Sequence, residues 1–256
     1  MFDRVTVRLQ AKSAALLLSL ETRLDRIMMG WLLVAGVASA VRIATSPVHG
    51  PFSVDGLLPY LLLVFAPFAS MVLALRWFAD ADSLPQPATR LAVLGRWRTM
   101  SLPEARRHPL YGTTGIMVSL LIGMLINVPV RAAEYLAAMP TLSGTIPPWL
   151  STLHALMTLD VVLLTSLYTI AFVAALRRVP LFPRLLVAIW MVDLLMQLAI
   201  AKFTVAQGGL PPTVASALHT LLDGNVTKAM ISVGLWLPYL FLSTRVNVTF
   251  RNRVPA

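Results

Sequence analysis

Residues 149–178 read WLSTLHALMTLDVVLLTSLYTIAFVAALRR. From Trp149 to Leu176 the stretch has one acidic residue, Asp160, and no Lys or Arg, and then Arg177 and Arg178 follow directly. A run of about 20 apolar residues is enough for a helix to cross the hydrocarbon core of a bilayer. The stretch therefore predicts a membrane-spanning helix that ends at a pair of arginines.

The same pattern recurs along the whole chain. Hydrophobic residues make up 57% of the 256 residues and charged residues only 12%, with a mean hydropathy of +0.77. A soluble core of this size could not bury so much apolar surface, so lipid must form part of the solvent. We expect an all-α polytopic membrane protein, a single transmembrane domain over residues 27–253 that folds as a six-helix transmembrane bundle. The predicted spans are about 28–45, 56–78, 113–133, 149–176, 185–203 and 226–243.

Three segments outside the spans carry their own signals. Residues 1–26 hold an apolar patch that is too short to cross a bilayer, which favours a cytoplasmic or interfacial helix. The longest loop, 79–112, is basic, and Ser101 with Glu104 predicts a capping box at the start of a short helix. Between the last two spans, the stretch from Pro211 to Gly224 predicts a separate amphipathic helix on the outer surface.

The basic residues alternate between the two ends of the predicted spans. All but four of the 21 Lys and Arg residues fall in segments that this topology places on one side. Basic loops stay in the cytoplasm, which predicts a bacterial inner-membrane protein with both termini cytoplasmic. The net charge of +10 then indicates anionic lipid head groups as partners, and no nucleic acid. The four exceptions are Arg42, Arg131, Lys202 and Lys228.

The residue composition and motifs do not favour disulfides, metal sites or the common catalytic sites. The chain has no Cys, which excludes disulfides, thiolate nucleophiles and cysteine-bound metals. Its four His are far apart and lack the spacing of a metal motif, so we expect no metal and no cofactor. A nucleophile elbow and a phosphate-binding loop are also missing, so we predict no catalytic residue and favour a protein that is not an enzyme.

Two acidic residues inside predicted spans are the strongest candidates for function. Asp160 and Asp193 both lie near mid-depth, where a carboxylate costs about 2.5 to 3.5 kcal/mol. Gln197 follows Asp193 by one helical turn, and Asn127 and Arg131 lie in another span. These five residues could form a proton-accepting or cation-binding site. Alternatively, the two aspartates are neutral or hydrogen-bonded residues that only support the bundle.

Polar and small residues also form a stripe with a spacing of four in the third span. Small residues at this spacing let a second helix approach closely, which predicts a helix-packing seam at the beginning of the stripe, at Gly115, Ser119 and Gly123. Near its other end, Arg131 is three residues before Glu134, which favours a local ion pair. The stripe comprises Gly115, Ser119, Gly123, Asn127 and Arg131.

The C-terminal residues resemble a known family. The stretch 236–250, WLPYLFLSTRVNVTF, is similar to the closing signature of a bacterial inner-membrane family catalogued as domain of unknown function 2569. Residues 30–33 and 182–185 support the resemblance, which covers about residues 27–48 and 155–253. It implies a four-span protein of unassigned activity, here with an insertion of two further spans. The motif residues are Trp236, Pro238, Tyr239, Ser243, Arg245, Val246 and Phe250.

Three functions follow from these observations. The first is an accessory or assembly protein that binds another membrane component, because the chain has packing seams and little mass outside the membrane. The alternative is a small proton- or cation-linked transporter that uses Asp160 and Asp193. The third is a lipid-modifying membrane enzyme.

Overall fold

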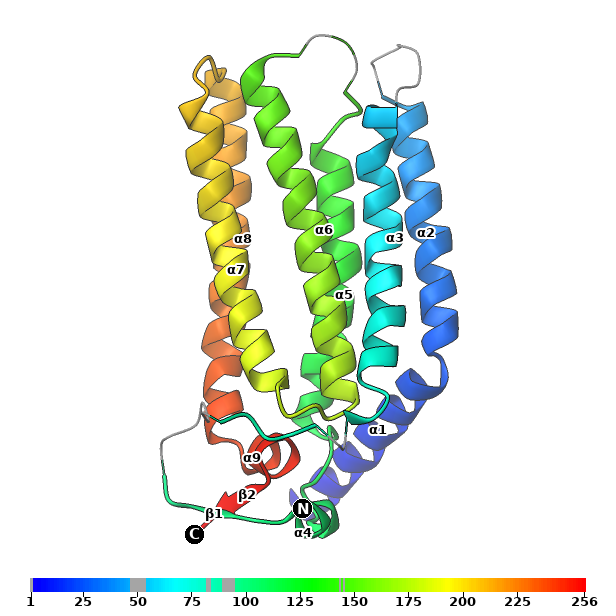
Figure 1. Ribbon diagram of the computed structural model, residues 1–256, viewed down its shortest axis with the longest axis vertical. Helices are drawn as coiled ribbons and strands as arrows, with labels where there is room; N and C mark the ends of the chain where they lie inside the picture. The colour runs from blue at the N-terminus through cyan, green and yellow to red at the C-terminus, as the bar shows by residue number, and fades with distance from the viewer. Residues whose placement is uncertain (1, 47–53, 82–83, 89–94, 143, 145) are drawn as a thin grey trace.

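Long helices that lie side by side dominate the computed structural model, which describes residues 2–46, 54–81, 84–88, 95–142, 144 and 146–256 (Figure 1). Within these residues, five helices are long and apolar enough to cross a membrane. Helices α8 and α9, bent by 70° at their junction, pass the same test only as a pair, and they make a sixth span if the pair is counted as one. The predicted all-α, multi-pass helix bundle is confirmed. The elements are α1 (Phe2–Thr22), α2 (Leu24–Ala44), α3 (Val54–Trp77), β1 (Trp97–Thr99), α4 (Leu102–Arg107), α5 (Ile116–Ala138), α6 (Pro148–Leu176), α7 (Phe182–Ala206), α8 (Pro212–Leu242), α9 (Thr244–Arg251) and β2 (Arg253–Pro255).

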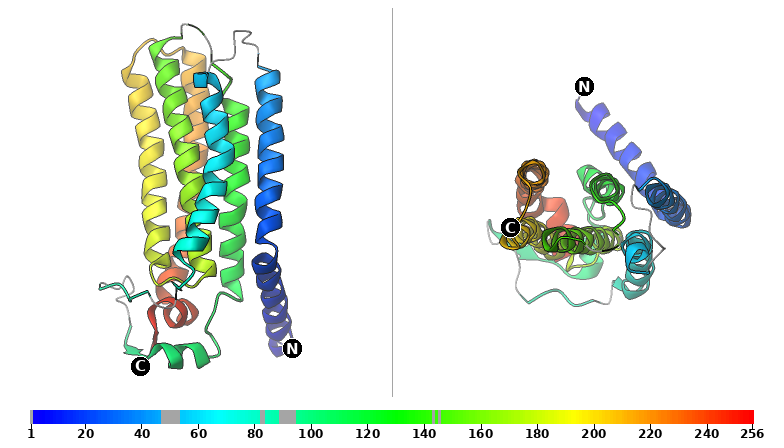
Figure 2. Two further views of the ribbon diagram at one scale, coloured as in Figure 1. Left: turned by 45° about the vertical axis from the view of Figure 1, so that its right-hand side comes forward. Right: turned by 90° about the horizontal axis from the view of Figure 1, so that it is seen from above.

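Helix α6 lies at the centre of the bundle. It packs against α3, α5 and α7, and it is the most buried of the five apolar helices (Figure 2). Helix α2 lies at the periphery against α3, and α8 packs mainly against α7 and α9. Few residues of α2 or α8 are buried, as is expected for helices that face lipid.

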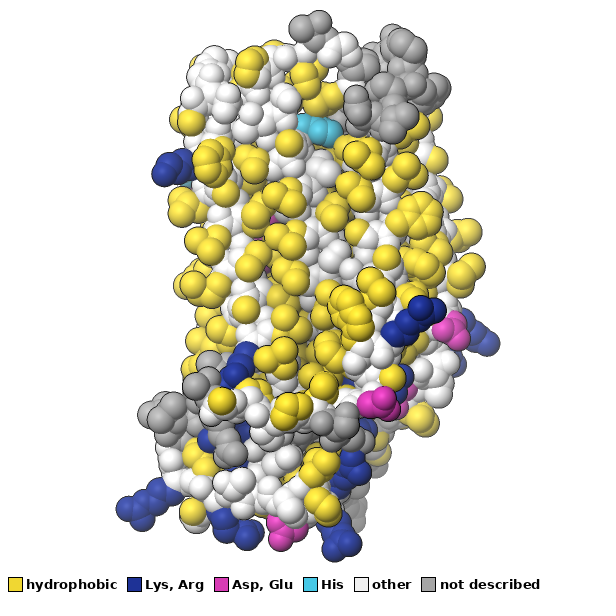
Figure 3. All heavy atoms as spheres, in the orientation of Figure 1, with side chains coloured by type: hydrophobic (Ala, Val, Ile, Leu, Met, Phe, Trp, Pro, Cys, Tyr) yellow, Lys and Arg dark blue, Asp and Glu magenta, His cyan; other side chains and the backbone are white. Residues whose placement is uncertain are grey.

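Both termini lie at the same end of the bundle, together with α4, α9 and the two strands (Figure 1). We call this the basic end, because Lys and Arg side chains gather there on the face that Figure 3 shows. The walls of the bundle above it are mainly apolar on that face. An even number of crossings brings both termini to one side, as the six predicted spans require.

Helix α1 leaves the bundle at an angle (Figure 2). Its predicted place at the membrane interface stays a prediction. It is separated from α2 at Arg23, where the helix is interrupted for one residue. The predicted capping box is also confirmed at the start of α4, since the Ser101 amide donates to Glu104 Oε2 at 2.8 Å. Part of the basic loop, residues 82–83 and 89–94, lies outside the described residues.

One prediction about the last span is wrong. Residues 212–242 form the single continuous helix α8, with no separate surface helix before Gly224. A glycine inside a helix costs only about 1 kcal/mol relative to alanine, so Gly224 does not end it. Leu218 and Leu222 are buried in the same apolar cluster as Tyr135 and Ile200, which holds the first half of α8 against the bundle.

A short antiparallel sheet joins the basic loop to the C-terminal tail, and the sequence did not indicate it. Strand β1 pairs with β2 so that Arg98 lies opposite Val254. The Arg253 guanidinium also lies 5.1 Å from the centre of the Trp97 ring. The tail is therefore tied to the loop by backbone pairing and a cation–π contact.

Candidate intramembrane polar site

Polar side chains from four neighbouring helices meet inside the bundle. All five residues that the sequence proposed as an intramembrane site are in this group, and two further residues join them. We call the group the polar cluster. Its members are Asn127 and Arg131 from α5, Asp160 and Tyr168 from α6, Asp193 and Gln197 from α7, and Asn225 from α8.

Arg131 is at the centre of the polar cluster. Its Nη2 atom forms an ion pair with Asp193 Oδ2, and its Nη1 atom lies 3.4 Å from Asp160 Oδ2. Its Nε atom donates to Asn127 Oδ1, one turn away on the same helix, at 3.0 Å. The side chain of Arg131 is 12% exposed, and those of Asp160 and Asp193 are 9% and 1% exposed. One guanidinium thus connects three helices in surroundings that water barely reaches.

The two carboxylates also accept hydrogen bonds from uncharged side chains. Gln197 Nε2 donates to Asp160 Oδ1 at 3.1 Å and lies 3.5 Å from Asp193 Oδ1. The Tyr168 hydroxyl donates to Asp193 Oδ2 at 3.4 Å. Asn225 Nδ2 in turn donates to Gln197 Oε1 at 3.1 Å, which extends the network to α8.

The charges in the polar cluster do not balance. One arginine faces two aspartates, so the fully ionised cluster carries one excess negative charge. A low-dielectric interior penalises such a charge, and a proton or a small cation would remove the penalty. Besides the two carboxylates, the polar cluster contains the side-chain oxygens of Asn127, Tyr168, Gln197 and Asn225. The part of the chain that the structure describes has no group of three or more His, Cys, Asp or Glu side chains, and the polar cluster itself has two carboxylates.

Apolar residues close the bundle on both sides of the polar cluster. Toward the basic end, Leu121, Phe172 and Leu186 are completely buried in one apolar core. Toward the opposite end, Tyr135 and Ile200 belong to a second apolar core. Apolar side chains therefore separate the polar cluster from both ends of the bundle.

A small cavity leads sideways from the polar cluster, between α5 and α8. Its volume is about 40 Å³, which is enough for at least one water molecule. Arg131, Tyr168 and Asp193 line its inner part, and Glu134 and Lys228 line it as well. The Glu134 and Lys228 side chains form an ion pair and are 37% and 59% exposed. The polar cluster is thus connected to the outer surface of the bundle by charged side chains.

The structure contradicts the predicted ion pair between Arg131 and Glu134. Arg131 pairs with two aspartates on neighbouring helices, and Glu134 pairs with Lys228 on α8. A local pair on a helix surface contributes only about 0.2 to 0.5 kcal/mol. Two carboxylates buried in the interior need a counter-charge far more, and they attract the guanidinium away from its sequence neighbour.

The first residue of the predicted packing seam, Gly115, meets other helices of the chain. It is the N-cap of α5 with a φ of +70°, its amide donates to Ser13 Oγ on α1 at 2.9 Å, and a Cβ atom added to it would lie 3.7 Å from Arg245 Nε on α9. Ser119 and Gly123 are exposed, and a Cβ atom added at Gly123 would meet nothing within 4 Å. Packing of this face against a partner stays a prediction.

Sequence reasoning missed two members of the polar cluster. Tyr168 follows Asp160 by eight residues, a little over two turns, and so lies on the same face of α6. That spacing could have identified it. Asn225 was overlooked because its neighbour, Gly224, was interpreted as the end of a helix.

The residues of the C-terminal motif build the corner between α8 and α9. The Trp236 and Tyr239 rings meet edge to face at 5.9 Å, and Ser243 lies at the bend. Arg245 donates to the Thr114 hydroxyl at 2.7 Å, which ties the corner to the start of α5. Pro238 lies inside α8, Val246 is fully buried in the core, and the Phe250 ring centroid lies 5.0 Å from that of Phe182.

Searches against protein-family models, curated protein sequences and solved structures find no match. The resemblance of the C-terminal motif to domain of unknown function 2569 therefore stays a prediction. What the chain shows on its own is a multi-pass helical membrane protein with a charged, hydrogen-bonded cluster buried in its interior.

Proposed function

We propose that the protein is a small carrier that binds a proton or a small cation at Asp160 and Asp193. The observation that carries this proposal is the excess carboxylate in the polar cluster. A bundle that needed only a structural link between helices would be served by one arginine and one aspartate. A second buried aspartate that shares the same guanidinium adds a cost and creates a group that binds positive charge.

The geometry supports an exchange of partners within the cluster. When one aspartate binds a proton, Arg131 forms a balanced pair with the other, and the cluster is neutral. When the proton leaves, Arg131 holds both carboxylates and the cluster becomes negative. Gln197 contacts both aspartates, so it can follow either arrangement without losing a hydrogen bond.

The side chains around the polar cluster support access to it from the α5–α8 face of the bundle. The cavity between α5 and α8 leads toward Glu134 and Lys228, and apolar cores close the axis of the bundle. Helix α8 packs mainly against α7 and α9, and its movement away from α5 would break the exposed ion pair between Lys228 and Glu134. Such a movement would open the polar cluster to the α5–α8 face of the bundle.

The test uses the purified protein in liposomes that contain a pH-sensitive dye. Imposed Na⁺, K⁺ or Li⁺ gradients should change the internal pH in liposomes with the wild-type protein. Asp160→Asn and Asp193→Asn should both abolish this change, because each removes a group that binds the transported charge. Asp223→Asn, which changes an exposed carboxylate of α8 outside both the polar cluster and its cavity, is the matched control and should retain flux.

Wild-type liposomes that show no flux with any of these gradients would count against a cation-linked carrier. A proton-only carrier would still move protons under a membrane potential, so a potassium diffusion potential is applied as well. If neither condition moves protons, the carrier proposal fails.

A second candidate is the accessory or assembly protein, and one observation favours it. Ser119 and Gly123 are exposed on α5, and the ion pair of Glu134 and Lys228 is exposed at the α5–α8 cavity. An ion pair in contact with lipid is costly, and Gly123, about three turns before Glu134 on α5, leaves space for another helix on the same face. A partner helix seated between α5 and α8 would cover both.

Purification from native membranes in a mild detergent separates the two candidates. Under the accessory hypothesis, a membrane protein is retained by the wild type and lost from Gly123→Leu, while Asp160→Asn retains it. Under the carrier hypothesis, Gly123→Leu keeps flux. A chain that always purifies alone contradicts the accessory hypothesis.

A further inference from the structure

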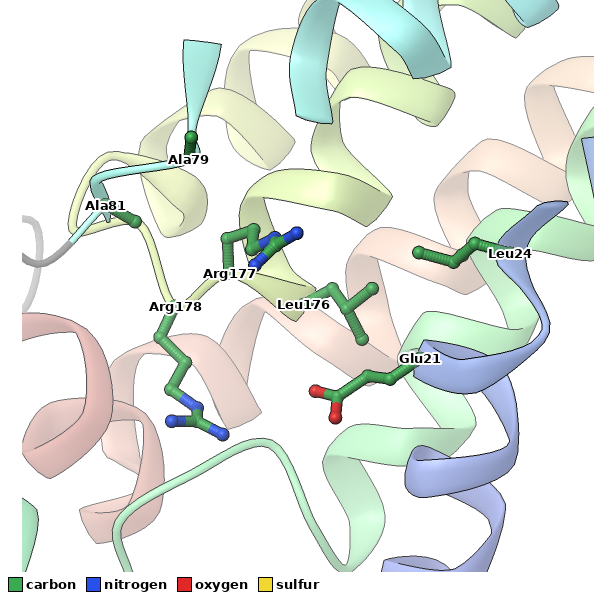
Figure 4. A pocket seen from close by; sticks show the side chains of 7 residues that line it. All are labelled: Glu21, Leu24, Ala79, Ala81, Leu176, Arg177 and Arg178. Atoms are coloured by element: carbon green, nitrogen blue, oxygen red, sulfur yellow. The ribbon is translucent and has the colours of Figure 1, made fainter. Parts of the chain in front are cut away.

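A charged cavity lies at the basic end, where α1 meets the bundle. Its volume is about 320 Å³. Glu21 at the end of α1 lines it on one side, and Arg177 and Arg178, just after α6, line it on the other (Figure 4). Leu24 and Leu176 complete the wall toward the membrane.

The three charged side chains of this cavity make different contacts. Within the described residues, Arg177 and Glu21 form no ion pair and no side-chain hydrogen bond. Arg178 has a φ of +57°, and its guanidinium lies 5.5 Å from the centre of the Tyr111 ring. Its Nε atom is buried and has no hydrogen-bond partner among the residues that the structure describes. The cavity therefore presents two positive groups and, across from them, one negative group.

An apolar crevice begins beside this cavity and continues into the bundle between α2, α3 and α5. Its volume is about 300 Å³, and its lining includes Met28, Phe68 and Leu125. Helix α2 lines both spaces, since Leu24 borders the charged cavity and Met28, one turn later, borders the crevice. The crevice reaches Thr169, which lies seven residues, or roughly 10 Å along α6, before Leu176.

We propose that these two spaces form one binding site for a phospholipid with a phosphoethanolamine head group. The lipid phosphate would bind Arg177 and Arg178, because guanidinium groups match phosphate in charge and geometry. Its primary ammonium would donate to Glu21, and one acyl chain would occupy the crevice. Charge complementarity selects this lipid, since phosphatidylglycerol has no cation for Glu21 and phosphatidylcholine has no N–H donor. The site is independent of the polar cluster and of the proposed transport.

The test is native mass spectrometry of the full-length protein in mixed micelles. Phosphatidylethanolamine, phosphatidylglycerol and phosphatidylcholine with identical acyl chains are supplied in equal amounts. We expect the wild type to retain phosphatidylethanolamine about tenfold more than either other lipid, as the gain of one charge-assisted hydrogen bond implies. Glu21→Gln should bring the ratio of phosphatidylethanolamine to phosphatidylglycerol close to equality. Because this ratio is read within one sample, it does not depend on how much protein folds.

The arginine and the crevice are tested with matched controls. Arg177→Gln should lower retention of all three lipids, whereas Arg76→Gln should not, because Arg76 is an exposed residue near the end of α3 that does not line the cavity. Gly30→Leu should lower lipid retention, because Gly30 lines the crevice and a Cβ there meets open space. Gly36→Leu makes the same change farther along α2, outside this crevice, and should have no effect.

Two outcomes would overturn the proposal. Equal retention of the three lipids by the wild type would show that Glu21 does not recognise an ammonium. Equal losses from Arg177→Gln and Arg76→Gln would show that lipids respond only to the overall charge of the basic end.

Discussion

Arg131 on α5 lies with its Nη1 atom 3.4 Å from Asp160 Oδ2 on α6, across 29 positions of the chain. The same guanidinium also pairs with an aspartate on α7. Three helices are thus joined through one side chain in the interior of a membrane bundle. Each member of this arrangement depends on the others, because a charge left alone there would be uncompensated.

Replacement of the arginine should be strongly destabilising. We expect Arg131→Gln to lower the free energy of unfolding by about 3 to 5 kcal/mol, because two buried carboxylates lose their counter-charge. Thermal or SDS-induced unfolding in detergent micelles would measure the effect. Lys228→Gln is the control, since its ion pair with Glu134 is exposed and should contribute no more than about 1 kcal/mol. Similar losses in the two variants would contradict a buried role for Arg131.

The two aspartates should differ in their effects on stability. Asp160→Asn leaves Arg131 paired with Asp193 and removes the excess charge, so we expect the free energy of unfolding to change by about 1 kcal/mol or less. Asp193→Asn should cost more, because Asp193 is the more buried of the two and also accepts the Tyr168 hydroxyl. The same unfolding assay compares them. A larger loss of stability from Asp160→Asn than from Asp193→Asn would contradict this prediction, and would mean that Asp160 is the main partner of Arg131.

The open face of α5 should tolerate a large side chain. A Cβ atom added at Gly123 would meet nothing within 4 Å. Replacement of a glycine inside a helix by a residue with a side chain stabilises the helix by roughly 0.5 to 1 kcal/mol. We therefore expect Gly123→Leu to have a melting temperature equal to or above that of the wild type. A clear drop in melting temperature would mean that this face is already packed within the protein.

The helix cap of α4 should respond to acid. The hydrogen bond from the Ser101 amide lowers the pKa of Glu104 below its ordinary value of 4.5. Because the folded pKa is depressed, the stabilisation of α4 is fully present above the ordinary pKa. It is lost as the pH falls through the lowered value.

Hydrogen exchange of residues 101–108 can follow this loss. The wild type should be better protected than Glu104→Gln at a pH of about 7, and the difference should disappear at a pH of about 3. A difference that is the same at both pH values would show that the carboxylate does not provide the cap.

The corner between α8 and α9 should depend on its aromatic contact. Phe250 is 1% exposed and packs against Phe182, so Phe250→Ala should lower the free energy of unfolding by about 3 to 5 kcal/mol. Leu242→Ala, at an exposed residue of the same corner, should change it by no more than about 0.5 kcal/mol. Equal melting temperatures for Phe250→Ala and the wild type would contradict the packing described here.

Local features of the sequence were sufficient to predict much of the helical structure of this protein. The apolar stretch before Arg177 and the cap at Ser101 each depend on residues close together in the chain. The membrane makes the signal of the apolar stretch strong, because every backbone polar group in lipid must be satisfied within its own helix. The similar predicted depth of Asp160 and Asp193 in the membrane was enough to suggest that the two side chains lie close together.

The partners of the charged residues could not be read from the chain. Arg131 has a close acidic neighbour in sequence, Glu134, but helix rotation turns it toward α6 and α7 instead. In the same way, Gly224 resembles a helix end, and only the packing of Leu218 and Leu222 makes α8 continuous.

By itself, the sequence determined which segments enter the membrane, because hydropathy is summed residue by residue along one helix. Only the tertiary structure decided which charges meet, because contacts between helices depend on the rotation and depth of each helix relative to its neighbours. Those two quantities are set by the packing of the entire bundle, and no short stretch of residues contains them.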